Sequence, residues 1–328
     1  REMNQIAEWS SIEREEIFQE AGASLGIKPA IIEKDFWVTW VLNILYSDTI
    51  LAKQLMFKGG TTLSKVYGLI ERFSEDIDLI LDWQCLSAQI PEEHLSKTKD
   101  QKMSRQLNKL ALQYIESSLL KRIESIVQPI CKVSIDSQDP YVLNLHYPVA
   151  FSDRYLRPGI RLEIGPMAAW NPHQKHFLSS LAAEVFPDIF KQSGCLVNVI
   201  LAKRTFWEKA TILHAEAHRP QDKKLPLRYS RHYYDLAQMA KAPIKEEALA
   251  DGDLLQQVVE FKQRFYPSSW AHYSTARIGS FKLIPTTHGL SELSEDYKNM
   301  RHMIYGDYPT FKHVITTLDD LEKEINLK

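Results

Sequence analysis

Residues 57–81 read FKGGTTLSKVYGLIERFSEDIDLIL and decide the fold of the chain around them. Apolar residues lead into the glycine pair 59–60, recur at helical spacing over 61–70, and then alternate at strand spacing. The pattern predicts a strand, a glycine turn, a helix, a short loop and a second strand. Because side chains alternate along a strand, Asp76 and Asp78 are expected on the same face.

Two carboxylates on one strand face suit Mg²⁺ or Mn²⁺, because such cations bind a few carboxylate oxygens together with water and phosphate oxygens. Gly59 and Gly60 have no side chains, so a phosphate can approach their backbone and the N–H groups of the following helix. A cation at Asp76 and Asp78 beside such a turn indicates nucleotidyl transfer. In that reaction an acceptor hydroxyl attacks the α-phosphorus of a nucleoside triphosphate.

Three other motifs fit these residues less well. A P-loop requires a lysine after its last glycine, where this chain has Thr61. An EF-hand loop requires an oxygen ligand where the chain has Ile80. The DxD motif of glycosyltransferases binds a metal and a nucleotide, but it does not require a glycine turn one helix upstream.

The runs 58–65 and 72–79 resemble the AbiEii/AbiGii toxin family of nucleotidyltransferases, which includes the MenT toxins. The long spacing between the glycines and the aspartates, with Arg-Phe-Ser-Glu before the pair, is similar to this branch of the nucleotidyltransferases. The resemblance implies that an NTP is the substrate and that Asp76 and Asp78 are catalytic. The nucleotide-binding residues it implies are Lys58, Gly59, Gly60, Thr61, Thr62, Arg72 and Ser74.

Composition is that of an ordinary globular protein, with 44% hydrophobic and 25% charged residues in a chain of 328. The net charge of −2 does not by itself demand a nucleic-acid partner. We expect an α+β nucleotidyltransferase-fold core with a mixed sheet at 51–165. An N-terminal helical segment at 1–50 and a C-terminal helical lobe at 166–328 are expected to flank it.

The first fifty residues read as two helices. The serine pair 10–11 offers an N-cap to the first helix, Gly26 a stop, and Pro29 a start for the second. The apolar part of the second helix is too short to span a bilayer, so a core helix is expected. Lys34 and Asp35 precede that part. The resembled family often carries a similar acidic-aromatic segment here, which implies that they line the site, whereas the pattern favours a solvated helix face.

A long helical pattern runs from about 96 to 127 and carries a series of basic residues. They are Lys97, Lys99, Lys102, Arg105, Lys109, Lys121 and Arg122. Such a series is usually a solvated helix face, and the alternative is an electrostatic platform for an RNA backbone. The sequence does not separate these two interpretations.

Strands are expected next, at 131–135, 142–147 and 160–164. Glu163 falls between apolar neighbours in the third of them and shares its face with Arg161. Nucleotidyltransferase folds generally place a third carboxylate on a neighbouring strand, where it completes the metal site or accepts a proton. Glu163 is our candidate, and a salt bridge to Arg161 is an almost equally good explanation.

Lys209 lies at the edge of the apolar stripe of a helix predicted at 201–219. From there its ammonium either reaches solvent, which the pattern alone favours, or enters a cleft and meets triphosphate oxygens. The resembled family has a Glu-Lys pair in this helix, matched by Glu208, and an Arg-x-x-Tyr-Asp motif on the next, matched by 231–235. The resemblance implies that Lys209 contacts phosphate and that Asp235 orients it or acts as a base.

Neither the histidines nor the cysteines indicate a zinc site. His214 and His218 are four apart on one helix face, but the HExxH motif and a third ligand at a suitable spacing are missing. Cys85, Cys131 and Cys195 lie far apart without a CxxC pair, which argues against a disulfide framework and a thiolate zinc site. A reducing cytoplasm fits, and we recognise no signal peptide.

The sequence therefore predicts a Mg²⁺-dependent enzyme that transfers a nucleotide from an NTP to a hydroxyl and releases pyrophosphate. The resemblance implies a toxin of a toxin–antitoxin or abortive-infection system that defends against phage. Its expected partners are a tRNA acceptor and a separately encoded antitoxin in the cytoplasm, without membrane contact. A protein side chain or a small molecule such as an aminoglycoside is an alternative acceptor, and a non-catalytic nucleotide- or partner-binding module is the alternative outside enzymes.

Overall fold

A computed structural model of the chain describes residues 2–86, 95–190 and 194–328. The chain divides into two compact units. The first comprises Arg1–Val66, Phe73–Glu92 and Lys102–Ile200, and the second comprises Tyr67–Arg72, Glu93–Gln101 and Leu201–Lys328. The stretch 57–81 therefore supplies residues to both units.

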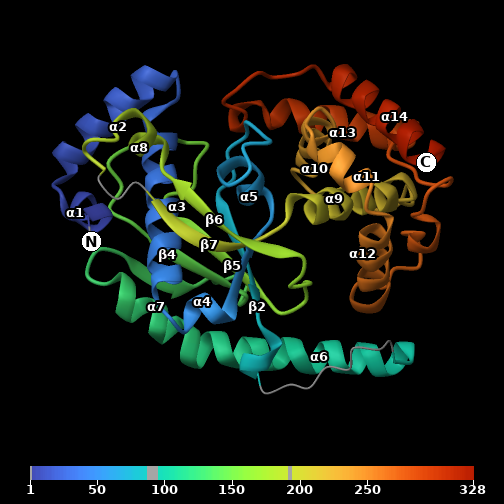
Figure 1. Cartoon of the computed structure of the whole chain (residues 1–328), viewed down its shortest axis with the longest axis horizontal. Helices are drawn as coiled ribbons and strands as arrows, with labels where there is room; N and C mark the ends of the chain where they lie inside the picture. Colours follow the sequence, from blue (N-terminus) through green and yellow to red (C-terminus); the bar gives the residue numbers. More distant parts are fainter. Residues whose placement is uncertain (1, 87–94, 191–193) are drawn as a thin grey trace. The chain divides into compact units, whose positions relative to one another are not determined.

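Seven strands in the described residues form one mixed sheet within the first unit. They are β1 (Leu55–Lys58), β2 (Asp76–Leu81), β3 (Lys132–Ile135), β4 (Val142–His146), β5 (Ile160–Gly165), β6 (His173–Ser179) and β7 (Gly194–Ile200). Their spatial order is β3-β4-β5-β2-β1-β7-β6 (Figure 1). β1 is antiparallel to β2 and parallel to β7, and β2 is parallel to β5. The predicted α+β class with a mixed sheet is confirmed.

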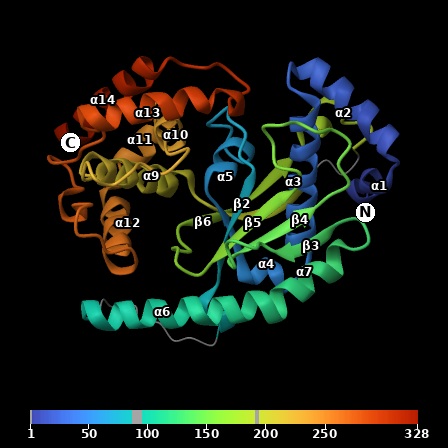
Figure 2. The ribbon, with the colours of Figure 1, turned by 180° about the vertical axis from the view of Figure 1, so that it is seen from behind.

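Helices precede these strands and connect them. They are α1 (Glu2–Glu8), α2 (Ser11–Leu25), α3 (Pro29–Ser47), α4 (Leu51–Gln54), α5 (Gly60–Lys65), α6 (Lys97–Tyr114), α7 (Leu120–Val127) and α8 (Leu181–Val185), with a short 3₁₀ turn at Trp83–Leu86. A π-helical turn at Ile115–Leu119 joins α6 to α7, so the long helix predicted at 96–127 is confirmed. Figure 2 shows α3 along the sheet with α2 beside it, and α3 packs against both β7 and α2.

The predicted ends of α2 are confirmed by its cap geometry. The Ser10 hydroxyl accepts a hydrogen bond from the Glu13 N–H at 3.3 Å, and the Glu13 carboxylate accepts one from the Ser10 N–H at 2.9 Å. This reciprocal pair is a capping box. Gly26 ends the helix in the left-handed conformation, with φ of 67°.

The charged start of α3 is buried, so the prediction of a solvated face there is wrong. Lys34 is 0% exposed, and its ammonium donates to the Arg157 carbonyl at 2.8 Å and lies 3.8 Å from Glu75. Asp35 accepts from Lys65 at 2.6 Å and from the Leu181 N–H at 2.6 Å. A buried charge is tolerable only when other groups of the protein replace its water shell, as these partners do.

The sheet continues past the predicted core boundary at residue 165. β6 and β7 pair in antiparallel register from His173 with Ile200 to Ser179 with Gly194, and both belong to the first unit. β6 reads HQKHFLS and is mostly exposed, since it lies at the edge of the sheet. A polar edge strand lacks the apolar alternation from which strands are predicted, and a helical region was expected here for that reason.

The second unit is helical in the described residues. Its helices are α9 (Ala202–Ala217), α10 (Ser230–Ala240), α11 (Ile244–Leu249), α12 (Gly252–Phe265), α13 (Thr287–Asn299) and α14 (Phe311–Leu327), with 3₁₀ turns at Tyr273–Thr275 and Arg301–Met303. α10 packs against α9, α13 and α14. Over the part of the chain that the structure describes, no helix combines the length and the apolar character needed to cross a membrane.

The burial of Lys34 makes the stability of the first unit depend on pH. Desolvation lowers the pKa of its ammonium from 10.5 to about 8, although Glu75 opposes that shift. Between these two values the unfolded chain binds more protons than the folded one, so the free energy of unfolding rises with pH there. The full rise from this one group is up to about 3 kcal/mol.

We expect a Lys34→Met variant to lose this rise, measured as urea unfolding at pH 8 and at pH 10. The control is Lys28→Met, since the Lys28 side chain is 59% exposed and its ammonium lies 3.5 Å from the Asp153 carboxylate. It should keep the pH dependence of the wild-type protein. Parallel pH dependences for the Lys34 variant and the wild type would contradict the prediction.

Candidate active site

One face of the sheet in the first unit carries charged side chains from two neighbouring strands. β2 and β5 run parallel, with Asp76 opposite Arg161 and Asp78 opposite Glu163. Residues paired across neighbouring strands point to the same face, so the three carboxylates share one face. The alternating apolar residues of β2 fill the opposite face and are buried.

Gly59 brings the backbone into contact with the Asp78 carboxylate. Its φ of +85° favours glycine, and a Cβ at this position would lie 2.1 Å from Asp78 Oδ2. A side chain here would displace the carboxylate or the turn. The glycine is therefore needed both for its backbone conformation and for the position of Asp78.

The turn after Gly59 is held by the two threonines that follow it. The Thr62 hydroxyl donates to the Gly59 carbonyl at 2.6 Å, and the Thr61 hydroxyl donates to the Asp76 carbonyl at 2.6 Å. The second bond fixes the start of β2 to the start of α5. Both hydroxyls are used to shape the turn.

The helix predicted at 61–70 is shorter than expected. α5 ends at Lys65, and the chain then turns through Gly68, which has a left-handed φ of +59°. A left-handed residue cannot continue a helix, and Ile70 beyond it is buried in an irregular segment.

The remaining predicted nucleotide-binding residues of the first unit lie around this turn. Lys58 ends β1 opposite Asp78 in the antiparallel register, so its side chain starts on the carboxylate face. Gly60 is the buried first residue of α5. Ser74 is half-buried, two residues before Asp76.

Arg161 provides a positive charge among these carboxylates. Its guanidinium lies 3.5 Å from Asp76 Oδ1 and 3.7 Å from Glu163 Oε1, and 3.2 Å from Asp136 Oδ2. Glu163 therefore both contacts Arg161 and lies on the carboxylate face, so the two explanations offered by the sequence are compatible.

Asp136 holds Arg161 in place. Its carboxylate accepts hydrogen bonds from the Asn144 side chain at 2.8 Å and from the Gln138 and Asp139 N–H groups at 2.9 and 3.0 Å. Hydrogen bonds from Asn144 and from these two N–H groups lower the pKa of Asp136 to about 2, with a further contribution from Arg161. The sequence analysis missed Asp136, and its only signal is an Asp at the end of a strand before the Asp139-Pro140 turn.

The pKa of Asp76 is raised above its ordinary value. Its partial burial is the main cause, the nearby Glu163 carboxylate adds to it, and Arg161 opposes it. Like charges that repel at close range are stabilised by a cation, and Mg²⁺ accepts one or two carboxylates with water and phosphate oxygens. The donor set therefore fits such a cation, held by Asp76 and Asp78.

A cluster of buried charges in the second unit contains the other predicted residues. Asp235 is 0% exposed, and its two oxygens accept from the Arg72 guanidinium at 2.6 and 2.7 Å. Lys209 lies 3.0 Å from Asp235 Oδ2. Burial alone would raise the pKa of Asp235, but Arg72 and Lys209 lower it below its ordinary value. A carboxylate with these contacts orients its cations and is poorly suited to be a base.

His232 is a member of this cluster that sequence reasoning missed. Its Nδ1 lies 2.8 Å from the Lys209 ammonium. Burial, then the charge of Lys209, lower the pKa of His232 far below 6.5, so the ring is neutral and its Nδ1 accepts the bond. Burial is also the main cause that lowers the pKa of Lys209. The sequence gives no signal for His232 beyond its place inside the 231–235 motif.

Backbone contacts hold Arg72 in the cluster. The Glu71 carbonyl accepts from the Tyr305 N–H at 3.0 Å, and the Glu71 N–H donates to the Tyr234 hydroxyl at 3.2 Å. Arg72 itself forms an isolated β-bridge with Ile304. The short segment that carries Arg72 is thus fixed on both sides.

The ring of His214 on α9 already has partners within the protein. His214 uses both ring nitrogens within the protein, since Nδ1 accepts from the Lys282 N–H at 3.0 Å and Nε2 contacts the His272 carbonyl at 3.0 Å. Among the described residues, no three or more His, Cys, Asp or Glu side chains gather closely enough to hold a metal. Two carboxylates with the oxygens of a nucleotide remain a suitable site for Mg²⁺.

The chain was compared with protein families, curated proteins and solved structures. A family described as nucleotidyl transferase AbiEii toxin, of type IV toxin–antitoxin systems, matches residues 40–320. No curated protein matches the chain. Among solved structures the chain is similar to MenT4, a nucleotidyltransferase toxin from Mycobacterium tuberculosis H37Rv, with 14% identity, coverage of 96% of this chain and 97% of MenT4, and a TM-score of 0.46.

We expect Gly59→Ala to weaken Mn²⁺ binding by at least about tenfold, because the new Cβ displaces the Asp78 carboxylate. Mn²⁺ affinity measured by calorimetry is the readout. Gly68→Ala is the matched control, since Gly68 also has a positive φ but a Cβ there meets nothing within 4 Å. Equal Mn²⁺ affinities of the two variants would contradict the assignment of Asp78.

We expect Asp235→Asn to lower the free energy of unfolding by about 3 kcal/mol, because it leaves two buried cations without their carboxylate. The control is Asp251→Asn, since Asp251 pairs with Lys203 at 2.7 Å with both side chains about 30% exposed. That variant should lose about 1 kcal/mol or less. Chemical denaturation measures both, and similar losses would show that the Asp235 cluster does not hold the unit together.

Proposed function

The chain belongs to the AbiEii family of nucleotidyl transferase toxins of type IV toxin–antitoxin systems, and on this basis we propose that it transfers a nucleoside monophosphate from an NTP to an RNA hydroxyl, with release of pyrophosphate. The observation that carries the proposal is the carboxylate face. Asp76 and Asp78 lie beside the glycine turn, with Glu163 opposite Asp78 on the next strand.

Asp76 and Asp78 hold Mg²⁺ or Mn²⁺ in this proposal, and the cation, when bound, neutralises charge on the triphosphate and polarises a phosphoryl oxygen. The main chain at Gly59 and Gly60 receives a phosphate, with Lys58 and Ser74 beside it. Thr61 and Thr62 keep the turn in shape through their hydroxyl bonds to the backbone. Arg161 remains tied to Asp136 and keeps its charge at the site.

Lys209 binds oxygens of the triphosphate and stabilises negative charge on the departing pyrophosphate. Asp235 is a positioning residue for Lys209 and Arg72, because its oxygens are already used by these two cations. Arg72 thus contributes to nucleotide binding through this cluster. Glu163 accepts the proton of the attacking hydroxyl, and the 41% exposure of its side chain makes it accessible to an acceptor.

The acceptor in this proposal is tRNA, and the protein acts as the toxin that a separately encoded antitoxin neutralises in the cytoplasm. The family supports the toxin role and the existence of an antitoxin. Modification of tRNA stops translation, which agrees with growth arrest and with phage exclusion as outcomes.

The test is label transfer. The protein is incubated with each α-labelled NTP and Mg²⁺ in the presence of total tRNA, total protein or no acceptor. We expect label on tRNA with one NTP, equimolar pyrophosphate, and loss of both in an Asp76→Ala/Asp78→Ala double variant. Transfer that survives in the double variant would overturn the site, and label on protein alone would overturn the RNA acceptor.

The same assay tests whether Lys209 takes part in the reaction or only supports the fold. Lys209→Met leaves the bidentate Arg72–Asp235 pair intact, so the unit stays folded, and we expect kcat to fall about 100-fold with unchanged Mn²⁺ binding. Lys203→Met, on the same helix and 29% exposed, is the control and should keep wild-type kcat. A normal kcat for Lys209→Met would remove this residue from the reaction.

A further inference from the structure

A polar cavity in the second unit has no part in the proposed chemistry. Its accessible volume is about 560 Å³, within the usual range for ligand sites. The residues that matter for its chemistry come from the start of α6, the end of α12 and the 3₁₀ turn after it. They are Lys97, Gln101, Gln263, Ser268, His272 and Tyr273.

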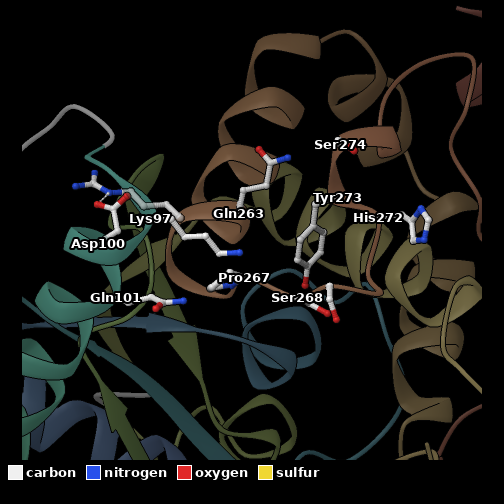
Figure 3. A pocket seen from close by; sticks show the side chains of 11 residues that line it. Lys97, Asp100, Gln101, Gln263, Pro267, Ser268, His272, Tyr273 and Ser274 are labelled. Atoms are coloured by element: carbon white, nitrogen blue, oxygen red, sulfur yellow. Dashed lines mark hydrogen bonds and ion pairs between the residues drawn. The ribbon is translucent and has the colours of Figure 1, made fainter. Parts of the chain in front are cut away.

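A buried ion pair builds one wall of this cavity. Arg264 donates to the Asp100 carboxylate at 3.1 Å, and the two side chains are 10% and 2% exposed. The charges of this pair compensate one another, so Lys97 supplies the net positive charge of the cavity. Figure 3 shows the Lys97 ammonium extending into the cavity toward Tyr273.

The opposite wall is held in a fixed shape. His272 has a left-handed φ of 52°, which is costly for a residue with a side chain. Its ring stacks on His218 at 4.4 Å, and its carbonyl contacts the His214 ring at 3.0 Å, so α9 holds the turn that presents Tyr273. The Tyr273 ring faces the cavity with its hydroxyl toward Ser268 (Figure 3). The aromatic surface therefore exists before any ligand arrives.

These groups match the parts of a ribonucleotide. An unstacked base packs against an aromatic ring, amide side chains read its edge, hydroxyls reach the 2′-OH, and a lysine binds the phosphate. We propose that this cavity binds a nucleotide of a single-stranded RNA segment, with Tyr273 against the base, Lys97 at the phosphate, and Gln101 and Gln263 at the base edge. The inference rests on the proposed function, because it names a subsite for the RNA acceptor.

A protein partner fits this lining less well. The centres of protein interfaces are rich in large apolar and aromatic side chains. Among the described residues of the lining, Pro267 and Tyr273 supply apolar surface, and amides, hydroxyls and charged groups make up most of the rest. The chemistry thus favours a polar, anionic ligand with a planar ring.

The test measures equilibrium binding of a labelled single-stranded RNA hexanucleotide of mixed sequence, and of the matching DNA, to the full chain by fluorescence anisotropy. We expect Tyr273→Ala to weaken RNA binding about tenfold or more, and Tyr273→Phe to keep most of it. Lys97→Ala should weaken binding and reduce the slope of log affinity against log salt by about 0.7, the value for one phosphate contact on a single strand. DNA should bind more weakly than RNA, because it lacks the 2′-OH.

Lys298→Ala is the control, because it removes a lysine of the second unit whose side chain is 71% exposed and lies outside the cavity lining. It should bind RNA like the wild type, and all variants should keep wild-type Mn²⁺ affinity. The inference is overturned if the wild type does not bind the hexanucleotide, or if the Tyr273 and Lys97 variants bind it as Lys298→Ala does. Loss of antitoxin binding with intact RNA binding in Tyr273→Ala would make the cavity a protein site and also overturn it.

Failure of this inference is distinguishable from failure of the proposed function. RNA binding that depends on Tyr273 without any label transfer by the wild type would overturn the proposed function and leave the cavity assigned. Label transfer to RNA with the same KM in wild type and Tyr273→Ala would overturn the assignment of the cavity as an RNA subsite and would leave the proposed function in place.

Discussion

The register between β2 and β5 is the constraint on which the chemistry of the first unit depends. Strand side chains alternate, so a slip of one residue would exchange Asp76 and Asp78 for Ile77 and Leu79. The two apolar residues are 0% and 2% exposed, and a slip would bury two carboxylates in their place. An unpaired buried carboxylate costs several kcal/mol, so the core of the sheet fixes the carboxylate face.

That face carries its own positive charge before a metal arrives. Arg161 is bound more closely to Asp136, at 3.2 Å, than to Asp76 or Glu163. Because Asp136 is itself fixed by Asn144 and two N–H groups, Arg161 can stay in place when a cation takes over Asp76. The arginine reduces the repulsion between Asp76 and Glu163, and in the proposed reaction its guanidinium would still be present for a phosphate.

The sequence predicted those parts of the fold that follow from local rules. The strand–turn–strand pattern around the glycines, the caps of α2 and the long helix from 96 to 127 all depend on spacing, turn chemistry or capping, and the structure has them. It did not reveal that Lys34 and Asp35 are buried, because their partners at 157, 65 and 181 are far away in the sequence. β6 was missed for a similar reason, since pairing with β7 and not apolar alternation makes it a strand.

The residues of the candidate site also divide into those that local rules predicted and those that depend on distant partners. Alternation alone places Asp76, Asp78 and Glu163 on one face once their strands pair, whereas Asp136 and His232 act through neighbours that only the folded chain provides. The link between Lys209 and Asp235 came from the resemblance to a family, and the structure adds the 3.0 Å contact between them. No local pattern specifies a contact between residues on two different helices.

In the second unit, Asp235 shares its charge between two buried cations. Asp235 stands between Arg72 and Lys209, so one negative charge serves two buried cations. The neutral His232 supplies a hydrogen-bond acceptor for Lys209 but no charge. Burial and the charge of Arg72 both work against the protonated form of Lys209, so the lysine gains most from an added anion. In the proposed reaction a triphosphate oxygen would supply that negative charge, and its binding would raise the pKa of Lys209 toward its ordinary value.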